Sequence, residues 1–364
     1  MNRHYNRKIV LEDGAEFYGY GFGADREIMA EVVFNTSMVG YQEILSDPSY
    51  TGQAVVMTYP LMGNYGICAD DFETGTPSIS AMIVREFNGE PSNFRCMETL
   101  EDFLKQYNIV GLAGVDTRRL ARYIRDRGSG KALICDALMP NLVCVARMKA
   151  AKLPGNQVEQ VSTKTVWKAA ARNPKYHVVA VDCGIKHNIL RSLNARGCDV
   201  TVVPWNTTAQ QVEALSPDGV FISNGPGNPE DATPVIALAG ALRGKYPIFG
   251  ICLGHQILAL SYGAKTYKLK FGHRGGNHPV KNLRTGRVEI TSQNHSYAVD
   301  AESLKGTGLE VTHINLLDET VEGVQSTADR VFSVQYHPES APGPQDSAYL
   351  FDQFLAMMEE GKNA

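Results

Sequence analysis

The feature that most constrains the fold is a short apolar segment that ends in a cysteine flanked by glycines. Residues 246–263 read YPIFGICLGHQILALSYG, so an apolar run leads into GICLG and then into a helix-like pattern. A nucleophile held in a sharp turn between a strand and a helix has this context. The glycines relieve crowding, so the residue between them can adopt a strained backbone conformation. We therefore predict that Cys252 is a nucleophile; the alternative at this point is a small buried cysteine in a tight turn.

Composition narrows the class of protein. The chain has 364 residues, 43% of them hydrophobic and 20% charged, with a net charge of -4, which is typical of a globular protein with two ordinary domains. Nothing in this balance indicates nucleic acid or a membrane as a partner. No apolar run approaches bilayer-spanning length, and the opening MNRHYNRKIV lacks the apolar core of a secretory signal. Seven scattered cysteines without C-x-x-C pairs indicate reduced thiols, a cytoplasmic location and no metal site.

Residues 1–150 are predicted to form a mixed α/β domain. Amphipathic spacing predicts one helix at 97–107 and a second at 116–128, with Asp116 as its N-cap. The second helix carries five arginines, which form either a solvated face or a docking surface for a partner. Strands are expected at 8–23 (two strands joined by an Asp13-Gly14 hairpin), 31–35, 54–59 and 129–136.

Two stretches of this half lack a regular pattern. Residues 35–53 (NTSMVGYQEILSDPSYTGQ) are rich in turn formers and are predicted to be a packed loop, which serves either as a binding surface or as a structural cap. The pattern loosens again from 140 to 174, with one short helical stretch. We therefore place a linker at 151–175 and begin a second domain at residue 176.

Strands and helices alternate in residues 176–364, which predicts an open, mostly parallel, doubly wound sheet. In such sheets ligands lie at the carboxyl ends of the strands. Two informative turns follow strands there, namely the Cys252 turn and the segment SNGPGNP at 223–229. This segment lacks the Lys-Ser/Thr ending of a phosphate-binding loop. It is either a plain turn or a source of a backbone N–H group for an oxyanion. In the second case Gly225 is one donor, and the amide of Leu253, directly after the nucleophile, is the other. The expected strands are 177–182, 199–203, 220–223 and 247–251, and the expected helices are 186–196 and 209–215.

A cysteine nucleophile needs a base and a group that orients the base. His337 ends the strand-like run 331–336 and is followed two residues later by Glu339, whose carboxylate can face the same side in extended chain. His255 lies in the helix after the cysteine and is expected to turn away from the sulfur. The other candidates lie in predicted loops or turns: His273 and His278 in FGHRGGNHPV, without a third metal ligand, and His295 after Asn294.

The motifs FGICLGHQ, SNGPGNP and QYHPE together resemble those of the triad-type class I glutamine amidotransferases, over residues 177 to about 360. The segments EVVFNTSMVGYQEILSDPSYTGQ, GVDTRRLARYIRDRG, KFGHRGGNHPV and HPESAPGPQDS are similar to those of the small, glutaminase subunits of carbamoyl-phosphate synthetase. The resemblance then spans nearly the whole chain. It implies that Cys252 is the nucleophile, His337 the base and acid, and Glu339 the orienting carboxylate.

The resemblance also implies a set of glutamine-binding positions. Some members of the family carry Gly-Phe where this chain has Ser296-Tyr297, so the pocket differs in detail there. Ser49 belongs to the DPSY segment of the first half, which would give the 35–53 loop a purpose. The implied L-glutamine-binding residues are Ser49, Gly225, Gly227, Leu253, Gln256, Asn294, Ser296 and Tyr297.

The activity implied is hydrolysis of L-glutamine to glutamate and ammonia through a cysteine thioester. The ammonia would pass through a tunnel to a large synthetase subunit, which makes carbamoyl phosphate from bicarbonate and ATP for arginine synthesis, pyrimidine synthesis or both. The implied assembly is a heterodimer, alone or within a higher oligomer, with ATP and Mg²⁺ on the partner and no cofactor in this chain. The alternatives are an amidotransferase subunit of another synthase, such as that of anthranilate or GMP synthesis, a cysteine peptidase on a similar fold, and a non-enzymatic regulatory module.

Overall fold

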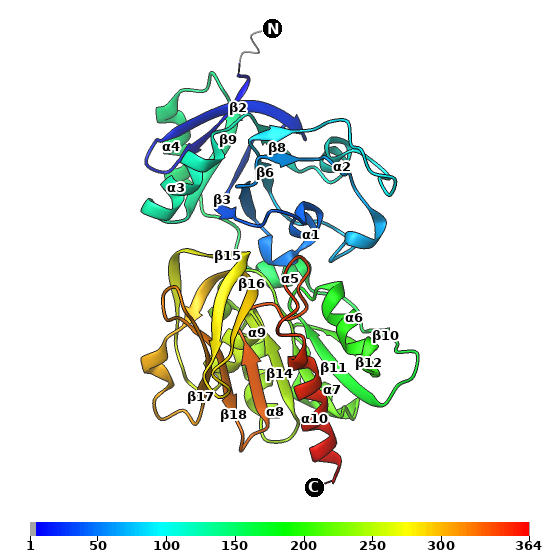
Figure 1. Cartoon of the computed structure of the whole chain (residues 1–364). Coiled ribbons are helices and arrows are strands. Elements are labelled where there is room, and N and C mark those ends of the chain that lie inside the picture. The colour runs from blue at the N-terminus through cyan, green and yellow to red at the C-terminus, as the bar shows by residue number, and fades with distance from the viewer. Residues whose placement is uncertain (1–4, 364) are drawn as a thin grey trace. The chain divides into compact units, whose positions relative to one another are not determined.

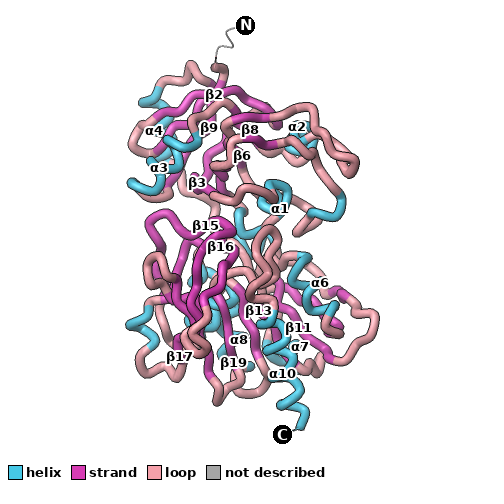
Figure 2. The backbone as a smooth tube through the Cα atoms, viewed as in Figure 1, coloured by secondary structure: helices cyan, strands magenta, loops and turns pink. Residues whose placement is uncertain are grey.

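The computed structural model describes residues 5–363, which form two compact units (Figures 1 and 2). The first unit runs to Gly155 and includes Lys270–Arg274; the second comprises Asn156–Leu269 and the chain from Gly275 onward. Residues 1–4 lie outside the described residues. They begin the segment MNRHYNRKIV, which is expected not to be a secretory signal. Among the described helices, none is long and apolar enough to span a bilayer.

The first unit is built on a closed barrel of seven strands in the order β1-β2-β8-β6-β4-β3-β9. Its core contains Ile9, Val32, Ile83 and Leu112, all from barrel strands, together with Leu120 from a covering helix. The strands are β1 (Arg7–Leu11), β2 (Glu16–Gly23), β3 (Ile28–Asn35), β4 (Gln53–Met57), β6 (Ala81–Ile83), β8 (Val110–Ala113) and β9 (Gly130–Asp136), and β5 (Leu61–Met62) pairs with β7 (Glu86–Phe87) outside it. The helices are α1 (Tyr41–Ser46), α2 (Leu100–Gln106), α3 (Thr117–Arg127) and α4 (Asn141–Ala150), with 3-10 turns at Pro48–Tyr50 and Ala69–Asp71.

The predicted hairpin and the predicted ends of the helix at 116–128 are confirmed, because hydrogen bonds between residues close in the chain form them. The β1–β2 hairpin turns at Gly14, whose φ of 88° favours glycine. Helix α3 begins with the Asp116 Oδ1 atom accepting from the Arg119 amide at 3.0 Å, and it ends at Gly128. Helix α2 begins later than predicted, because the Thr99 hydroxyl accepts from the Asp102 amide and caps it there.

The prediction of a loop at 35–53 is wrong in part. The segment contains α1 and the turn Pro48–Tyr50, where the Asp47 carboxylate accepts from the Ser49 amide at 2.9 Å. The Asn35 side chain donates to the Tyr50 hydroxyl at 2.7 Å in the interior of the unit. These buried side-chain bonds hold helical turns in a sequence whose composition alone indicates only turns.

The second unit contains a ten-stranded sheet in the order β10-β12-β11-β13-β14-β19-β18-β16-β15-β17. The five strands from β12 to β19 in this order are parallel, and antiparallel strands extend the sheet on both sides. The strands are β10 (Trp167–Ala169), β11 (Tyr176–Asp182), β12 (Cys198–Pro204), β13 (Gly219–Ile222), β14 (Ile248–Ile251), β15 (Thr266–Asn282), β16 (Val288–Val299), β17 (Glu310–Asn315), β18 (Val321–Ser326) and β19 (Val331–Val334). The helices are α5 (Gln157–Val161), α6 (His187–Ala195), α7 (Ala209–Ala214), α8 (Thr233–Leu242), α9 (Leu253–Ser261) and α10 (Tyr349–Asn363), with 3-10 turns at Pro229–Asp231 and Ala301–Leu304.

Helices cover both faces of the parallel strands, which confirms the doubly wound fold. Phe249 of β14 packs in one cluster with Ile189 of α6 and Phe354 of α10. Its neighbour Ile248 packs in another cluster, which contains buried side chains of α7, α8 and α9, among them Ile257 of α9. Because successive strand residues point to opposite faces, the apolar run of β14 is buried on both sides.

Three predictions about this half are corrected. Residues 156–175 are not a linker but part of the second unit, since β10 pairs with β12 and Val158 of α5 is buried in its core. The segment FGHRGGNHPV is not a loop but lies within β15, and His295 lies in β16 rather than in a turn. Pairing with the neighbouring strands of the sheet keeps these glycine- and histidine-rich segments extended, although their composition favours turns. Helix α8 was not anticipated.

Candidate active site

The cysteine turn is a strained elbow between β14 and α9. Cys252 has φ 55° and ψ -103°, a conformation that residues with a side chain rarely adopt. Both flanking glycines are required, because a Cβ on Gly250 would lie 2.7 Å from the Gly254 carbonyl oxygen. A Cβ on Gly254 would lie only 2.1 Å from the carbonyl oxygen of Ile222 on β13. Backbone packing against the neighbouring strand therefore fixes the elbow and the position of the sulfur.

The base prediction agrees with the geometry of the sheet. Strand β19 pairs in parallel with β14, so the chain that leaves β19 reaches the same edge as the elbow. His337 follows there, with its amide donating to the Ser292 carbonyl oxygen at 2.9 Å. Its Nδ1 atom lies 2.7 Å from Glu339 Oε1, and both side chains are buried. This bond fixes the ring so that Nε2 is the nitrogen left for proton transfer.

The electrostatic setting makes His337 a strong base. Burial disfavours the charged ring, but the Glu339 carboxylate outweighs it and raises the pKa of His337 well above its usual value of 6.5; Cys252 also raises it. The contribution from Cys252 requires the thiol and the imidazole to be neighbours. Burial alone would raise the pKa of Glu339, yet the positive charges of Lys186 and His337 lower it below the usual 4.5. Glu339 therefore stays ionised beneath the ring.

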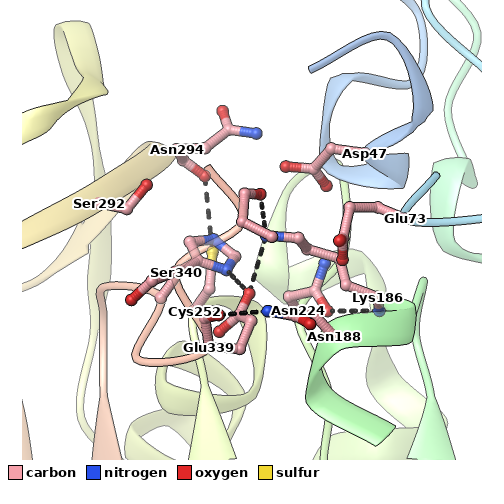
Figure 3. Close-up of polar contacts among 12 residues, drawn as sticks. Asp47, Glu73, Lys186, Asn188, Asn224, Cys252, Ser292, Asn294, Glu339 and Ser340 are labelled. Atoms are coloured by element: carbon pink, nitrogen blue, oxygen red, sulfur yellow. Dashed lines mark hydrogen bonds and ion pairs between the residues drawn. The ribbon is translucent and has the colours of Figure 1, made fainter. Parts of the chain in front are cut away.

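Lys186 is a member of this cluster that the sequence did not reveal. It caps α6, and its Nζ atom donates to Glu339 Oε1 at 2.8 Å and to the Ala341 carbonyl oxygen at 3.1 Å. The Asn188 side chain donates to the backbone carbonyl of Glu339 (Figure 3). Lys186 is buried, so its ammonium is committed to the carboxylate. The signal in the sequence was weak: Lys186 follows the end of the buried parallel strand β11 by four residues, in the turn at the edge where ligands bind.

The predicted oxyanion donors belong to the loop after β13 and to the first residue of α9. A Cβ on Gly225 would lie 2.8 Å from the Leu253 side chain and 2.2 Å from the Cys183 carbonyl oxygen. The loop of residues 225–227, called the GPG loop below, therefore passes close to the elbow. The Leu253 amide is the first of α9 and has no acceptor within the helix. The Ser223 hydroxyl accepts from the Cys183 amide at 2.9 Å and holds the start of the loop. Gly227 has φ 92°, a backbone conformation that favours glycine, and it lies against the Gln157 side chain.

Among the predicted glutamine-binding residues of the second unit, Asn294 lies beside the elbow and Gln256 belongs to the helix that follows it. The Cys252 sulfur donates to the Asn294 carbonyl oxygen at 3.6 Å, which places β16 next to the nucleophile (Figure 3). The Gln256 amide nitrogen donates to the carbonyl of Tyr297 and to the side chain of Gln335, both at 2.8 Å. Gln256 thus ties α9 to β16, and Ser296 lies between these two contacts of the strand.

Two further predicted positions stand apart from this group. His255 is buried with its Nδ1 atom 2.9 Å from the Ser333 hydroxyl, and burial lowers its pKa to about 3. A ring that stays neutral and faces Ser333 is not the base, as predicted. Ser49 belongs to the first unit, and its role toward glutamine remains a prediction.

A cysteine elbow beside a buried His–Glu pair on a doubly wound sheet defines a cysteine-dependent acyl-transfer enzyme of the α/β class. The comparisons agree. Residues 179–357 match the glutamine amidotransferase class-I family, and residues 9–134 match the carbamoyl-phosphate synthase small chain, CPSase domain. The chain belongs to the carbamoyl phosphate synthase small chain family.

Proteins named carbamoyl phosphate synthase small chain match this chain over nearly its whole length. That of Fusobacterium nucleatum subsp. nucleatum is 56% identical, covering 96% of this chain and 98% of the relative. That of Bacillus caldolyticus is 54% identical, covering 97% of each. One from Staphylococcus epidermidis is 53% identical, covering 98% of this chain and 97% of the relative.

Proposed function

We propose that this chain is the glutamine-hydrolysing subunit of a carbamoyl-phosphate synthetase, which releases ammonia from L-glutamine for a separate large subunit. The observation that carries the proposal is the Cys252 elbow beside the buried His337–Glu339 pair. The membership in the small-chain family supports the choice among amidotransferases, because the match includes residues 9–134 of the first unit. It also weighs against an anthranilate or GMP type of subunit, a peptidase and a non-enzymatic module.

The reaction begins with transfer of the thiol proton to His337. The thiolate is the reactive form of cysteine, and the raised pKa of His337 favours this transfer. Cys252 then attacks the side-chain carbonyl carbon of glutamine. The oxyanion of the tetrahedral intermediate accepts hydrogen bonds from the Leu253 and Gly225 amides. Loss of one such donor costs about 3–4 kcal/mol of the barrier in comparable sites.

The second half of the reaction uses the same histidine in reverse. His337 returns its proton to the departing nitrogen, ammonia leaves, and a γ-glutamyl thioester remains on Cys252. His337 then takes a proton from water, whose oxygen attacks the thioester carbon. Glutamate leaves as the sulfur is reprotonated. Glu339 keeps the ring in one orientation and stabilises its charged form throughout.

Glutamine is proposed to bind around the elbow with its amide at the sulfur. The backbone near Asn294 and the GPG loop provide polar groups close to the nucleophile. The proposed contacts are Ser49, Gly225, Gly227, Leu253, Gln256, Asn294, Ser296 and Tyr297.

The partner is proposed to be the large synthetase chain, in a cytoplasmic heterodimer alone or within a larger assembly. Free ammonia is protonated in neutral water and loses its nucleophilicity. An internal tunnel would deliver the ammonia from glutamine hydrolysis to the acceptor site before it is protonated. ATP and Mg²⁺ bind the partner, which makes carbamoyl phosphate for arginine synthesis, pyrimidine synthesis or both. Residues 1–150 are proposed to provide the docking surface.

The proposal is tested with the complex of this chain and the large chain, comparing Cys252→Ser with the wild type. We expect glutamine-dependent carbamoyl phosphate synthesis to be lost and ammonia-dependent synthesis to be retained. Cys198→Ser is the matched control, since Cys198 is also a buried cysteine but begins β12, away from the elbow. Loss of both activities in Cys252→Ser would contradict the division of labour, and peptide hydrolysis without glutamine hydrolysis would favour a peptidase.

A further inference from the structure

A basic groove in the first unit is not used by the proposed mechanism. Its volume is about 880 Å³, and four arginines line it: Arg85, Arg118, Arg122 and Arg125. A single carboxylate, that of Asp116, lies among the lining residues. This carboxylate accepts from the Arg119 amide at the start of α3, so it already has a structural role. The groove therefore carries a net positive charge.

The spacing of the arginines on α3 places three of them on the groove side. Residues 118, 122 and 125 are separated by four and three positions, so they share one face of the helix. Arg119 and Arg127 differ, because their guanidinium groups lie over the rings of Phe17 and Tyr123, at 5.3 and 6.0 Å from the ring centres. The helix thus divides its basic residues between packing within the unit and a groove.

The groove arginines have few partners of their own. Within residues 5–363, the guanidinium groups of Arg85, Arg118 and Arg122 make no hydrogen bond or ion pair. Among the residues that the structure describes, Arg125 pairs only with its exposed neighbour Asp126, a contact that contributes little. Positive groups that line one groove without bound anions repel one another, and an anionic partner relieves that repulsion.

Apolar surface beside the groove indicates a protein segment rather than a small anion. Phe34 and Pro60 line the groove together with the arginines. Tyr59, next to Pro60 in the chain, and Met38, which follows the groove residue Thr36 by two positions, are exposed. Arginine and large apolar side chains together are typical of protein interfaces. A small anion would engage the guanidinium groups and leave this apolar rim in water.

We propose that this groove binds a carboxylate-rich segment of the large synthetase chain, through ion pairs from Arg85, Arg118, Arg122 and Arg125. The inference rests on the proposed function for the identity of the partner. Guanidinium groups match carboxylates in a two-pronged geometry, so the groove fixes the orientation of the acidic segment as well as attracting it. Charged contacts of this kind mainly set the rate and orientation of association and weaken with added salt.

The test measures the dissociation constant of the full-length chain and the large chain at low and high salt. The variant carries Arg118→Glu and Arg122→Glu, and the control carries Arg119→Glu and Arg127→Glu on the same helix. We expect the groove variant to bind at least about tenfold more weakly at low salt, with a flatter salt dependence. The control is expected to stay within about threefold of the wild type. Glutamine hydrolysis by the isolated groove variant is expected to equal that of the wild type, which shows that the active site is folded.

The outcomes separate this inference from the proposed function. If the wild-type chain does not bind the large chain, both fail. If the wild type binds and supports glutamine-dependent synthesis but the groove variant binds equally well, only the groove inference is overturned. Inorganic phosphate is the probe for a small-anion site: phosphate binding that the groove variant loses, with unchanged binding of the large chain, would likewise overturn it.

Discussion

Replacement of Lys186 by methionine tests the electrostatic account of the active site. Methionine keeps an unbranched side chain of similar length but removes the ammonium that donates to Glu339 Oε1 at 2.8 Å and to the Ala341 carbonyl oxygen at 3.1 Å. The Lys186 and Glu339 side chains are 3% and 0% exposed, so water does not compensate for the loss. Within the described part of the chain, Glu339 is then left with His337 as its one charged partner.

The magnitude follows from the loss of one partner of a buried pair. Such a loss typically costs about 3–5 kcal/mol of folding stability. For catalysis, a hydrogen bond to a charged group contributes about 1.5–3 kcal/mol, which corresponds to a decrease of about 10- to 150-fold in kcat/KM if it holds Glu339 in place. The stability from a carboxylate whose pKa is lowered is present above its unfolded value and is lost as the pH falls through the folded value. Without Lys186 the pKa of Glu339 rises, so this loss begins at a higher pH.

The assay is the pH dependence of glutamine hydrolysis between about pH 5 and 9, with unfolding in denaturant measured in parallel. We expect the acid limb of kcat/KM to move to higher pH in Lys186→Met. The control is Lys245→Met, which breaks the exposed pair with Glu213 and is expected to change neither quantity appreciably. A folded Lys186→Met variant with the wild-type acid limb and rate would refute the reasoning. A uniform decrease with an unchanged profile would assign Lys186 a purely structural role.

Two more predictions concern a close steric contact and the packing of the core. Gly225→Ala would place a Cβ 2.2 Å from the Cys183 carbonyl oxygen, so the loop must shift; we expect kcat/KM for glutamine to decrease about 10²- to 10³-fold, and near-wild-type kinetics would show that the Gly225 amide is not a donor. Phe249→Ala removes a fully buried ring stacked on Phe332 at 4.3 Å and is expected to lower the free energy of unfolding by about 3–5 kcal/mol. Phe94→Ala, at a side chain that is 98% exposed, is its control, and equal losses in denaturant unfolding would contradict the assigned core.

The sequence by itself determined the parts of the protein that depend on neighbours along the chain. The glycines around Cys252 predicted the elbow, and the spacing from His337 to Glu339 predicted the bond observed at 2.7 Å. Apolar runs separated by helical patterns predicted the parallel strands, because a strand buried on both faces must be apolar at every position. The N-cap Asp116 and the terminal Gly128 likewise bounded α3.

Only the tertiary structure decided which distant segments meet. Closure of the barrel joins β1 to β9 across more than a hundred residues, and no local pattern specifies that register. Lys186 and Glu339 are 153 residues apart in the chain. No local pattern predicts their ion pair, because the fold brings them to the same edge of the sheet. The histidine-rich segments of β15 and β16 are extended because neighbouring strands bond to them. Local backbone preferences select the elements, whereas long-range pairing and the burial of charge select how they combine.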